Sequence, residues 1–286
     1  MQPTAHILPD GRRLHLQHGP IDLIIGVDGQ RDRAFAAATE RFQTVLQELV
    51  DELTELRAPL GAETRPPGGP VAQRMHRAAM PFVDAGFMTR MIAVAGAVAD
   101  EMLHAMLANA ICERAYVNNG GDIALFLGDG ATFGTAMQDH AGNPLGRIEV
   151  SAGDGVGGIA TSGRHGRSHS LGIADSVTVL AKTAAIADVA ATLCANAVDL
   201  PDHAAVTRRP ASELGDQGDL GDLPVVVGCG PLTDQACDVA LGRGVQRAQT
   251  YCDQTRIHSA ALFLQGRVRT TGARLFALRN REDAYA

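Results

Sequence analysis

The stretch GIATSGRHGRSHSLGIADSVTVLAKTAAIADVAATL, residues 158–193, places a polar loop between two apolar runs and ends in an alanine-rich segment. The apolar runs, residues 159–161 and 177–181, are short and rich in β-branched residues, so they predict strands. The alanine-rich segment predicts a helix over residues 183–198. The loop carries Gly, Ser, Arg and His, which raises the question of whether it is a solvated connection or part of a binding site.

Two polar residues of the predicted helix, Asp188 and Thr192, lie four positions apart and therefore share one face. A carboxylate and a hydroxyl placed in this way can bind one oxygen-preferring cation, of which Mg²⁺ is the usual example. The alternative is structural: Asp188 would interact with the dipole of its helix, and Thr192 would bond back to the preceding turn. The spacing by itself favours the structural alternative.

The loop supplies groups that suit a phosphate or a carboxylate. Hydroxyls and the planar guanidinium of arginine are the side chains that hold such oxygens. The candidates for ligand binding are Thr161, Ser162, Gly163, Arg164 and Arg167. His169 adds an imidazole that can transfer protons near neutral pH. A solvated basic loop would have the same composition.

A second polar corner, VNNGGDI at residues 117–123, lies between two predicted strands. A glycine pair lets the backbone approach a ligand closely, and amide and carboxyl side chains add hydrogen-bonding partners. The candidate ligand-binding residues are Asn118, Asn119, Gly120, Gly121 and Asp122. The spacing alone is more typical of a plain hairpin turn.

The order of the predicted elements indicates the fold class. A strand over residues 21–29 precedes a long amphipathic helix over residues 31–56. A later helix, residues 91–107, is so rich in Ala and Gly that it must pack very closely on another element. Strands and helices follow in runs without strict alternation, which indicates one α+β domain, residues 1–286. The polar segment 199–224 is expected to be an exposed excursion.

Composition narrows the functional class. The chain has 286 residues, of which 45% are hydrophobic, and its net charge of -7 argues against a nucleic-acid partner. Its five cysteines are scattered and are expected to be reduced thiols. We see no export signal and no apolar run that approaches the ~20 residues of a membrane span. We therefore expect a cytoplasmic protein without a membrane partner. A homodimer would suit the small-residue helix, which intramolecular packing explains equally well.

In this order the motifs resemble those of the ApbE-like superfamily of flavin-binding proteins, which includes Mg-dependent FMN transferases. YVNNGGDIAL resembles the family's Val-Asn-x-Gly-Gly-Asp-Ile, GIATSG resembles its Ala-Thr-Ser-Gly turn, and the helix resembles its Ala-Asp-x-x-x-Thr. The resemblance covers residues 92–198, over a third of the chain. It implies a T-fold-like arrangement of mixed or antiparallel sheets and long packed helices in duplicated halves. It also implies that Asp188 and Thr192 bind the metal.

The chain differs from the transferases in two segments. They carry Ala-Lys-Gly-Tyr where this chain has VAGA, residues 94–97, and His-x-x-Asp-Pro-x-Thr-Gly where this chain has HSLGIADS. In the second segment His169 stands nearest to the family's histidine. The whole chain is more similar to the short, unexported and largely uncharacterised branch of the superfamily, whose members are linked to sulfur assimilation.

The leading hypothesis is a protein that binds FAD, FMN or a related phosphorylated ligand together with Mg²⁺. If it transfers FMN, His169 or Asp175 takes the proton of the acceptor. One alternative is a flavin-independent enzyme that acts on a small anionic metabolite of sulfur or amino-acid metabolism. Another is a non-catalytic protein that delivers a cofactor to a partner enzyme.

Overall fold

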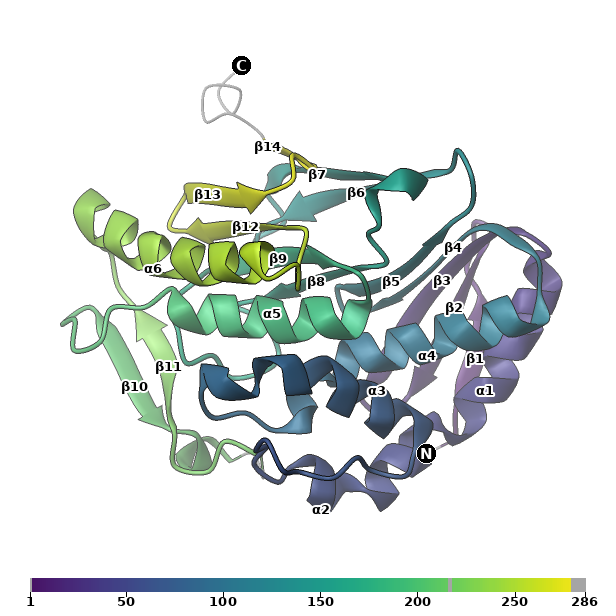
Figure 1. Ribbon diagram of the computed structural model, residues 1–286, viewed down its shortest axis with the longest axis horizontal. Helices are drawn as coiled ribbons and strands as arrows, with labels where there is room; N and C mark the ends of the chain where they lie inside the picture. The colour runs from purple at the N-terminus through teal and green to yellow at the C-terminus, as the bar shows by residue number, and fades with distance from the viewer. Residues whose placement is uncertain (1, 216–217, 279–286) are drawn as a thin grey trace.

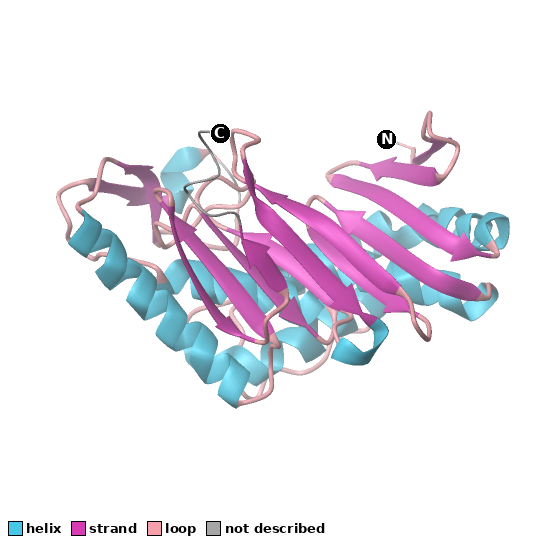
Figure 2. Cartoon of the chain, turned by 90° about the horizontal axis from the view of Figure 1, so that it is seen from above, coloured by secondary structure: helices cyan, strands magenta, loops and turns pink. Residues whose placement is uncertain are grey.

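The computed structural model describes residues 2–215 and 218–278, and it shows a large sheet with helices along one face (Figures 1 and 2). The strands of this sheet follow the order β1-β2-β3-β4-β5-β8-β9-β12-β13, and each paired neighbour is antiparallel. Their bounds are β1 Thr4–Ile7, β2 Arg13–His18, β3 Ile21–Gly29, β4 Cys112–Asn119, β5 Asp122–Leu127, β8 Gly158–Ser162, β9 Ser176–Ala181, β12 Ser259–Leu264 and β13 Arg267–Gly272.

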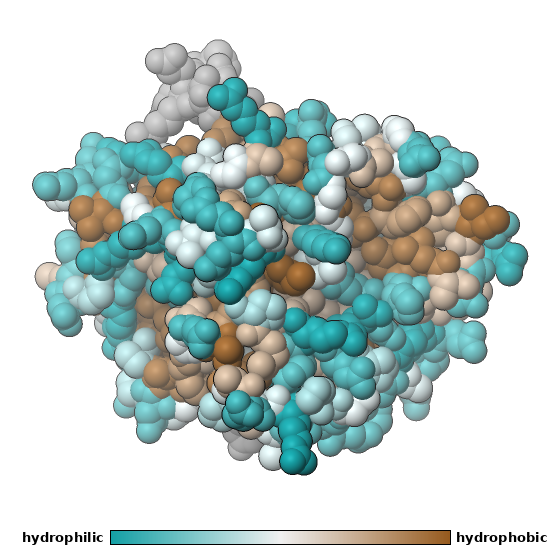
Figure 3. Space-filling model, viewed as in Figure 1, coloured by the Kyte–Doolittle hydropathy of each residue, from teal (hydrophilic) through white to brown (hydrophobic). Residues whose placement is uncertain are grey.

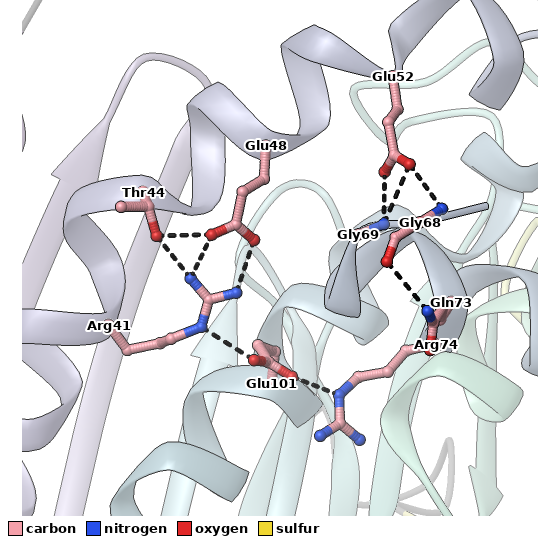
Figure 4. A network of polar contacts seen from close by, with 9 residues as sticks. All are labelled: Arg41, Thr44, Glu48, Glu52, Gly68, Gly69, Gln73, Arg74 and Glu101. Carbon is pink, nitrogen blue, oxygen red and sulfur yellow. Dashed lines mark hydrogen bonds and ion pairs between the residues drawn. The ribbon is translucent and has the colours of Figure 1, made fainter.

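Helices pack their apolar stripes on this sheet. Their bounds are α1 Arg31–Asp51, α2 Leu53–Leu56, α3 Pro70–Ala79, α4 Val94–Asn109, α5 Ala184–Ala197 and α6 Asp234–Asp253, with short 3-10 helices η1 Met80–Ala85, η2 Arg90–Ala93, η3 Ala152–Asp154 and η4 Ala211–Leu214. The helix predicted over residues 31–56 is divided at Glu52, which leaves helical geometry with φ -103° and ψ 5°. The Glu52 carboxylate accepts the N–H groups of Gly68 and Gly69 instead (Figure 4).

The large sheet and its main helices follow the same plan twice. In the first half, hairpin β2–β3 is followed by α1, α4 and hairpin β4–β5; in the second, hairpin β8–β9 is followed by α5, α6 and hairpin β12–β13. The halves join where β5 pairs with β8, through Ile123 with Ile159 and Ala124 with Gly158. The expected α+β fold with antiparallel sheets and duplicated halves is therefore confirmed.

Two smaller sheets complete the described part of the chain. Strands β6 Thr132–Gln138, β7 Pro144–Ser151 and β14 Phe276–Leu278 form one sheet, which packs on the other face of the large sheet. Strand β10 Val206–Pro210 pairs with β11 Pro224–Cys229 in the other. The segment 199–224, expected to be an exposed excursion, thus contains β10 and η4. Positions 216–217 of that segment lie outside the described residues.

Helix α4 continues from η2, and together they form an apolar helical segment of 20 residues, Arg90–Asn109. By length and composition alone this segment could cross a membrane, although no apolar run of that length was expected from the sequence. Half of its apolar window is buried inside the protein. It contacts α1, α3, α5, β4 and β5. Packing in the core therefore accounts for its composition.

Helices α4 and α5 begin beside each other and run in opposite directions (Figure 1). Gly96 permits this contact, because a Cβ there would lie 2.3 Å from the carbonyl oxygen of Ala184. Each helix also caps the other. Asp100 accepts the N–H groups of Ala184 at 3.0 Å and Ala185 at 2.9 Å, and Asp188 accepts that of Gly96 at 3.0 Å. These bonds satisfy N–H groups that a helix start leaves without partners.

A buried carboxylate, Glu101, holds α4 against α1 and α3 (Figure 4). It accepts hydrogen bonds from Nε of Arg41 at 2.9 Å and from Nε of Arg74 at 2.6 Å. Arg41 makes a further ion pair with Glu48. Burial by itself would raise the pKa of Glu101, but the two guanidinium groups outweigh burial, and the pKa is lowered.

The close contact at Gly96 predicts a stability defect in Gly96→Ala, because the new methyl group meets the backbone of Ala184. We expect urea titration to show a loss of ~1–3 kcal/mol in the free energy of unfolding. Gly242→Ala is the matched control, since Gly242 also lies in a helix but a Cβ there meets no atom within 4 Å. The control should be neutral or stabilising by up to ~1 kcal/mol. Equal effects would contradict the contact.

The lowered pKa of Glu101 predicts a pH-dependent contribution to stability. A carboxyl whose pKa is lower in the folded state stabilises above its unfolded-state pKa, and this stabilisation is lost as the pH falls through the folded-state pKa. Glu101→Gln should therefore cost ~2 kcal/mol at pH 7 and less at pH 3 in urea unfolding. Glu40→Gln, at an exposed position of α1, should change little at either pH. A pH-independent penalty in Glu101→Gln would contradict the ion pairs.

Candidate functional site

The two polar corners predicted from the sequence meet where the halves join. Asp122 begins β5, and its Oδ1 accepts the N–H of Thr161 on β8 at 3.2 Å. At the end of β4, the Asn119 side chain donates to the carbonyl of Ala95 in the first turn of α4, at 3.1 Å. The β4–β5 turn, strand β8 and the start of α4 are therefore linked by hydrogen bonds.

The predicted metal-binding pair lies at the same junction. Asp188 is half-buried and caps α4, as described above. Thr192, one turn further along α5, donates to the hydroxyl oxygen of Ser162 on β8 at 3.3 Å. The structural alternative for this pair is met only in part. Asp188 does interact with a helix start, but with that of α4, and the hydrogen bond of Thr192 goes to β8 and not to its own helix.

The ionised forms of the carboxyl groups at this junction are destabilised, as their raised pKa values indicate. Burial raises the pKa of Asp122 to about 7. Burial also raises the pKa of Asp188 well above its ordinary value, and the nearby charge of Asp122 raises it further. Burial raises the pKa of Asp100 to about 6. In the part of the chain that the structure describes, no arginine or lysine pairs with Asp122 or Asp188. A bound cation would relieve this arrangement.

Residues with hydroxyl groups lie next to the two carboxyl groups, and the backbone N–H of one of them, Thr161, bonds to Asp122. The hydroxyl of Thr161 lies 2.9 Å from that of Thr178, and Thr192 is one turn from Asp188. Thr161 is exposed and Asp122 is buried, so the cluster reaches from the surface into the interior. No group of three or more His, Cys, Asp or Glu side chains suited to a metal occurs within residues 2–215 and 218–278. Mg²⁺ does not require one, because hydroxyl, carbonyl and water oxygens complete its shell.

The glycine corner is a hairpin turn that also faces an arginine. Gly120 and Gly121 have φ values of +64° and +112°, a region that favours glycine. The Gly121 N–H donates to Oδ1 of Asn118 at 2.8 Å. Nη2 of Arg167 would lie 3.1 Å from a Cβ on Gly120, and its Nη1 donates to the carbonyl of Pro20 at 3.4 Å. The exposed guanidinium thus lies beside the turn, where it can bind an anion.

Arg164 and Asp175, predicted for ligand binding and proton transfer, are bound to each other. Nε and Nη2 of Arg164 lie 3.1 and 2.7 Å from Oδ1 of Asp175. The other oxygen of Asp175 accepts the N–H of Gln265, in the β12–β13 turn. These contacts join Asp175 to Arg164 and Gln265, and within the described ranges they do not join it to Asp122 or Asp188. The ion pair ties the loop to the second half of the sheet.

The remaining predicted residues lie on either side of this ion pair. Gly163 is buried, and a Cβ there would lie 2.4 Å from the carbonyl oxygen of Asp175. His169 is half-buried further along the loop. The next residue, Ser170, accepts the N–H of Val226 in β11 through its carbonyl at 2.8 Å. The roles predicted for His169 and Asp175 stay predictions.

Asp100 and Gly96 were not predicted from the sequence, although a signal for them exists. The segments GAVAD, residues 96–100, and AAIAD, residues 184–188, are similar in sequence, although α4 is the second main helix of its half and α5 is the first of its half. Aligning them places Asp100 opposite Asp188. This local similarity, and not the duplication, is the signal in the sequence for the reciprocal caps.

Relatives are known by sequence and by structure. A UPF0280 protein of Methanopyrus kandleri is 39% identical over 161 residues, which cover 55% of this chain and 61% of the relative. One of Methanococcus vannielii is 42% identical over 128 residues, or 40% of this chain and 47% of the relative. The chain thus matches less than two thirds of the length of these relatives.

Two solved structures share the fold. The ApbE protein of Thermotoga maritima has a TM-score of 0.53 and 13% identity, with 94% of this chain and 97% of that chain covered. The flavinyl transferase ApbE of Pseudomonas stutzeri, in its apo form, has a TM-score of 0.52 and 11% identity, with 96% of each chain covered. At these identities the likeness establishes the fold alone.

A family model places the chain more specifically. The model described as AbpE bacteria matches residues 5–270, which include both halves of the sheet and every residue of the junction. With a match over nearly the whole chain, and with the ApbE fold, this protein belongs to the family described as AbpE bacteria.

Proposed function

We propose that this protein binds Mg²⁺ at Asp122 and Asp188 and, beside it, the phosphate groups of a flavin nucleotide. One observation carries the proposal. Two carboxyl groups from different halves, the buried Asp122 and the half-buried Asp188, lie close enough for one charge to raise the other's pKa, and no arginine or lysine of the described residues pairs with them. A divalent cation is the partner that such a pair of oxygen ligands selects.

Each residue of the junction has a role in this proposal. Asp188, Asp122 and the hydroxyl of Thr192 hold the metal, which supplies positive charge next to the phosphates. Arg167 binds a phosphate through its planar guanidinium beside the glycine turn. The hydroxyls of Thr161 and Ser162 hold further ligand oxygens. These side chains orient the ligand before any chemical step.

The flavin part of the proposal is supported by the family and by the flavinyl transferase that shares the fold. We assign Asn118 and Asn119 to the nucleotide through the side-chain atoms that their bonds to Gly121 and Ala95 do not use. If FMN is transferred, an acceptor oxygen forms the new bond to phosphorus, the diphosphate bond of FAD breaks and AMP leaves. The acceptor's proton goes to His169 or to Asp175, of which Asp175 is paired with Arg164.

We also propose the cellular location and the partners of this protein. We place the protein in the cytoplasm, with a small-molecule ligand and without a nucleic-acid or membrane partner, on the sequence arguments given above. A homodimer is not required for the site, because all its residues come from one chain. The small residues at the start of α4 are used against α5.

Calorimetry with FAD and Mg²⁺ tests the proposal, and Asp188→Asn is the decisive variant. We expect micromolar binding of FAD that EDTA abolishes. Asp188→Asn keeps an oxygen for the Gly96 N–H but loses the charge, so it should weaken Mg²⁺-dependent binding by ~100-fold, or ~3 kcal/mol. Arg167→Gln should weaken FAD binding by ~10-fold without changing the affinity for Mg²⁺ alone.

Asp100→Asn is the matched control, because Asp100 makes the same kind of helix cap outside the proposed metal site. It should lower stability by ~1 kcal/mol and leave the affinity for Mg²⁺ within ~3-fold of wild type. If Asp188→Asn retains Mg²⁺ binding, or if both variants lose it equally, the metal assignment is wrong. Mg²⁺ binding without FAD binding would refute the flavin and leave a different phosphorylated or anionic ligand.

A further inference from the structure

A second polar cleft lies apart from the junction, between α6, the end of α5 and η1. Its volume is about 640 Å³, and its lining includes Phe82, Asp84, Arg243, Arg247, Tyr251 and Arg256. Hydrophilic residues gather over α6 on the face shown in Figure 3. None of the residues proposed above for Mg²⁺ or flavin lines this cleft.

Three arginines give the cleft a positive charge. Arg243 donates to the carbonyl of Asp199 at 2.9 Å, and Arg247, one helical turn later, donates to the Tyr251 hydroxyl at 3.4 Å. Neither these two nor Arg256 forms an ion pair with a carboxylate among the residues that the structure describes. Asp84 is the acidic residue of the lining. The cleft is therefore a cationic feature of a chain whose net charge is -7.

Arg256 is held over an aromatic floor. Its Cζ lies 5.1 Å from the ring centroid of Phe82 and 5.9 Å from that of Tyr251. The two rings meet edge to face with their centroids 4.9 Å apart. This arrangement fixes the guanidinium by cation–π attraction and leaves its N–H groups to bind a ligand.

The backbone before Arg256 is strained. Thr255 has a φ of +55°, in the left-handed region that β-branched residues rarely adopt. This turn follows the end of α6 and returns the chain to Tyr251, whose carbonyl accepts the N–H of Arg256 at 2.9 Å. The N–H of Thr255 also donates to the carbonyl of Cys252 at 2.9 Å, so this turn is the common left-handed end of an α-helix, and it fixes where Arg256 leaves α6.

The dipole of α6 does not explain the three arginines. A helix C-terminus attracts cations, but the effect fades within the last turn. Arg243 lies more than two turns before Asp253, where α6 ends, and Arg256 faces the aromatic rings. The helix dipole therefore does not account for the cluster.

We propose that this cleft binds a small organic phosphate or diphosphate without a metal. Arg243, Arg247 and Arg256 surround the phosphate oxygens, which a guanidinium binds through two parallel hydrogen bonds. The edge-to-face pair of Phe82 and Tyr251 is buried beneath Arg256 and holds its guanidinium in place, which leaves the rest of the cleft to the organic part. The cleft volume lies within the ~300–1,000 Å³ of ligand sites in proteins.

Inorganic pyrophosphate is the probe that tests this site, with the full chain in EDTA so that metal-dependent binding is removed. In the wild type it should slow modification by phenylglyoxal at Arg247 and Arg256 at least fivefold, as mapped by mass spectrometry, and leave Arg33 unchanged. Calorimetry should show ~10-fold weaker pyrophosphate binding in Arg247→Gln and in Arg256→Gln. Arg33→Gln removes the same charge at an exposed position of α1 and should bind as wild type does.

The same measurements separate this site from the junction. Asp188→Asn should bind pyrophosphate as wild type does, whatever its effect on Mg²⁺ and FAD. Failure of pyrophosphate to protect Arg247 and Arg256 at millimolar concentration would overturn the proposal. So would an equal loss of affinity in Arg33→Gln, which would indicate a general charge effect, or a loss in Asp188→Asn, which would place the probe at the junction.

Discussion

The reciprocal capping of α4 and α5 is the contact on which the junction of the two halves depends. The carboxylates of Asp100 and Asp188 each accept hydrogen bonds from N–H groups of the opposite helix. Burial raises the pKa of both. The helices approach this closely because Gly96 has no side chain. Across the sheet, β5 and β8 form two ladder pairs, and the N–H of Leu125 adds a bond to the carbonyl of Gly157. The helix contact therefore contributes much of what fixes one half against the other.

The candidate site lies at one of two aspartates that cap each other's helices. Asp100 and Asp188 make similar helix caps, but the pKa of Asp188 is raised by burial and also by the charge of Asp122. Four residues after Asp188 stands Thr192, which bonds to β8, whereas four residues after Asp100 stands the exposed His104. We therefore assign a structural role to Asp100 and propose that Asp188 combines capping with metal binding.

The sequence predicted well those elements whose apolar residues are regularly spaced. Strand β3 has the predicted bounds, residues 21–29, because its apolar residues alternate toward the helices. The division at Glu52 could not be predicted, because the carboxylate is drawn to Gly68 and Gly69 across a loop. Strand β10 is short, polar and paired at one edge only, so it has little pattern of its own. Strand β2 was missed although its buried Leu14 and Leu16 do alternate with polar residues.

The site was predictable in its residues but less so in their roles. The segments 117–123 and 158–193 contain the side chains that meet at the junction, among them Asp122, Thr161 and Asp188. The pairing of Arg164 with Asp175 depends on how the loop closes, which no spacing in the sequence indicates. The same holds for the approach of Arg167 to Gly120, which comes from a different half. Chemistry can be inferred from residue type, whereas contact across the halves requires the structure.

A crystal structure grown with Mn²⁺ tests the central claim most directly, because Mn²⁺ accepts oxygen ligands similar to those of Mg²⁺ and has an anomalous signal. We expect one anomalous peak between the halves, bonded to carboxylate oxygens of both Asp122 and Asp188, with the hydroxyl of Thr192 beside it. A peak bound elsewhere, or no peak while Asp188 still caps α4, would contradict a metal site at the junction.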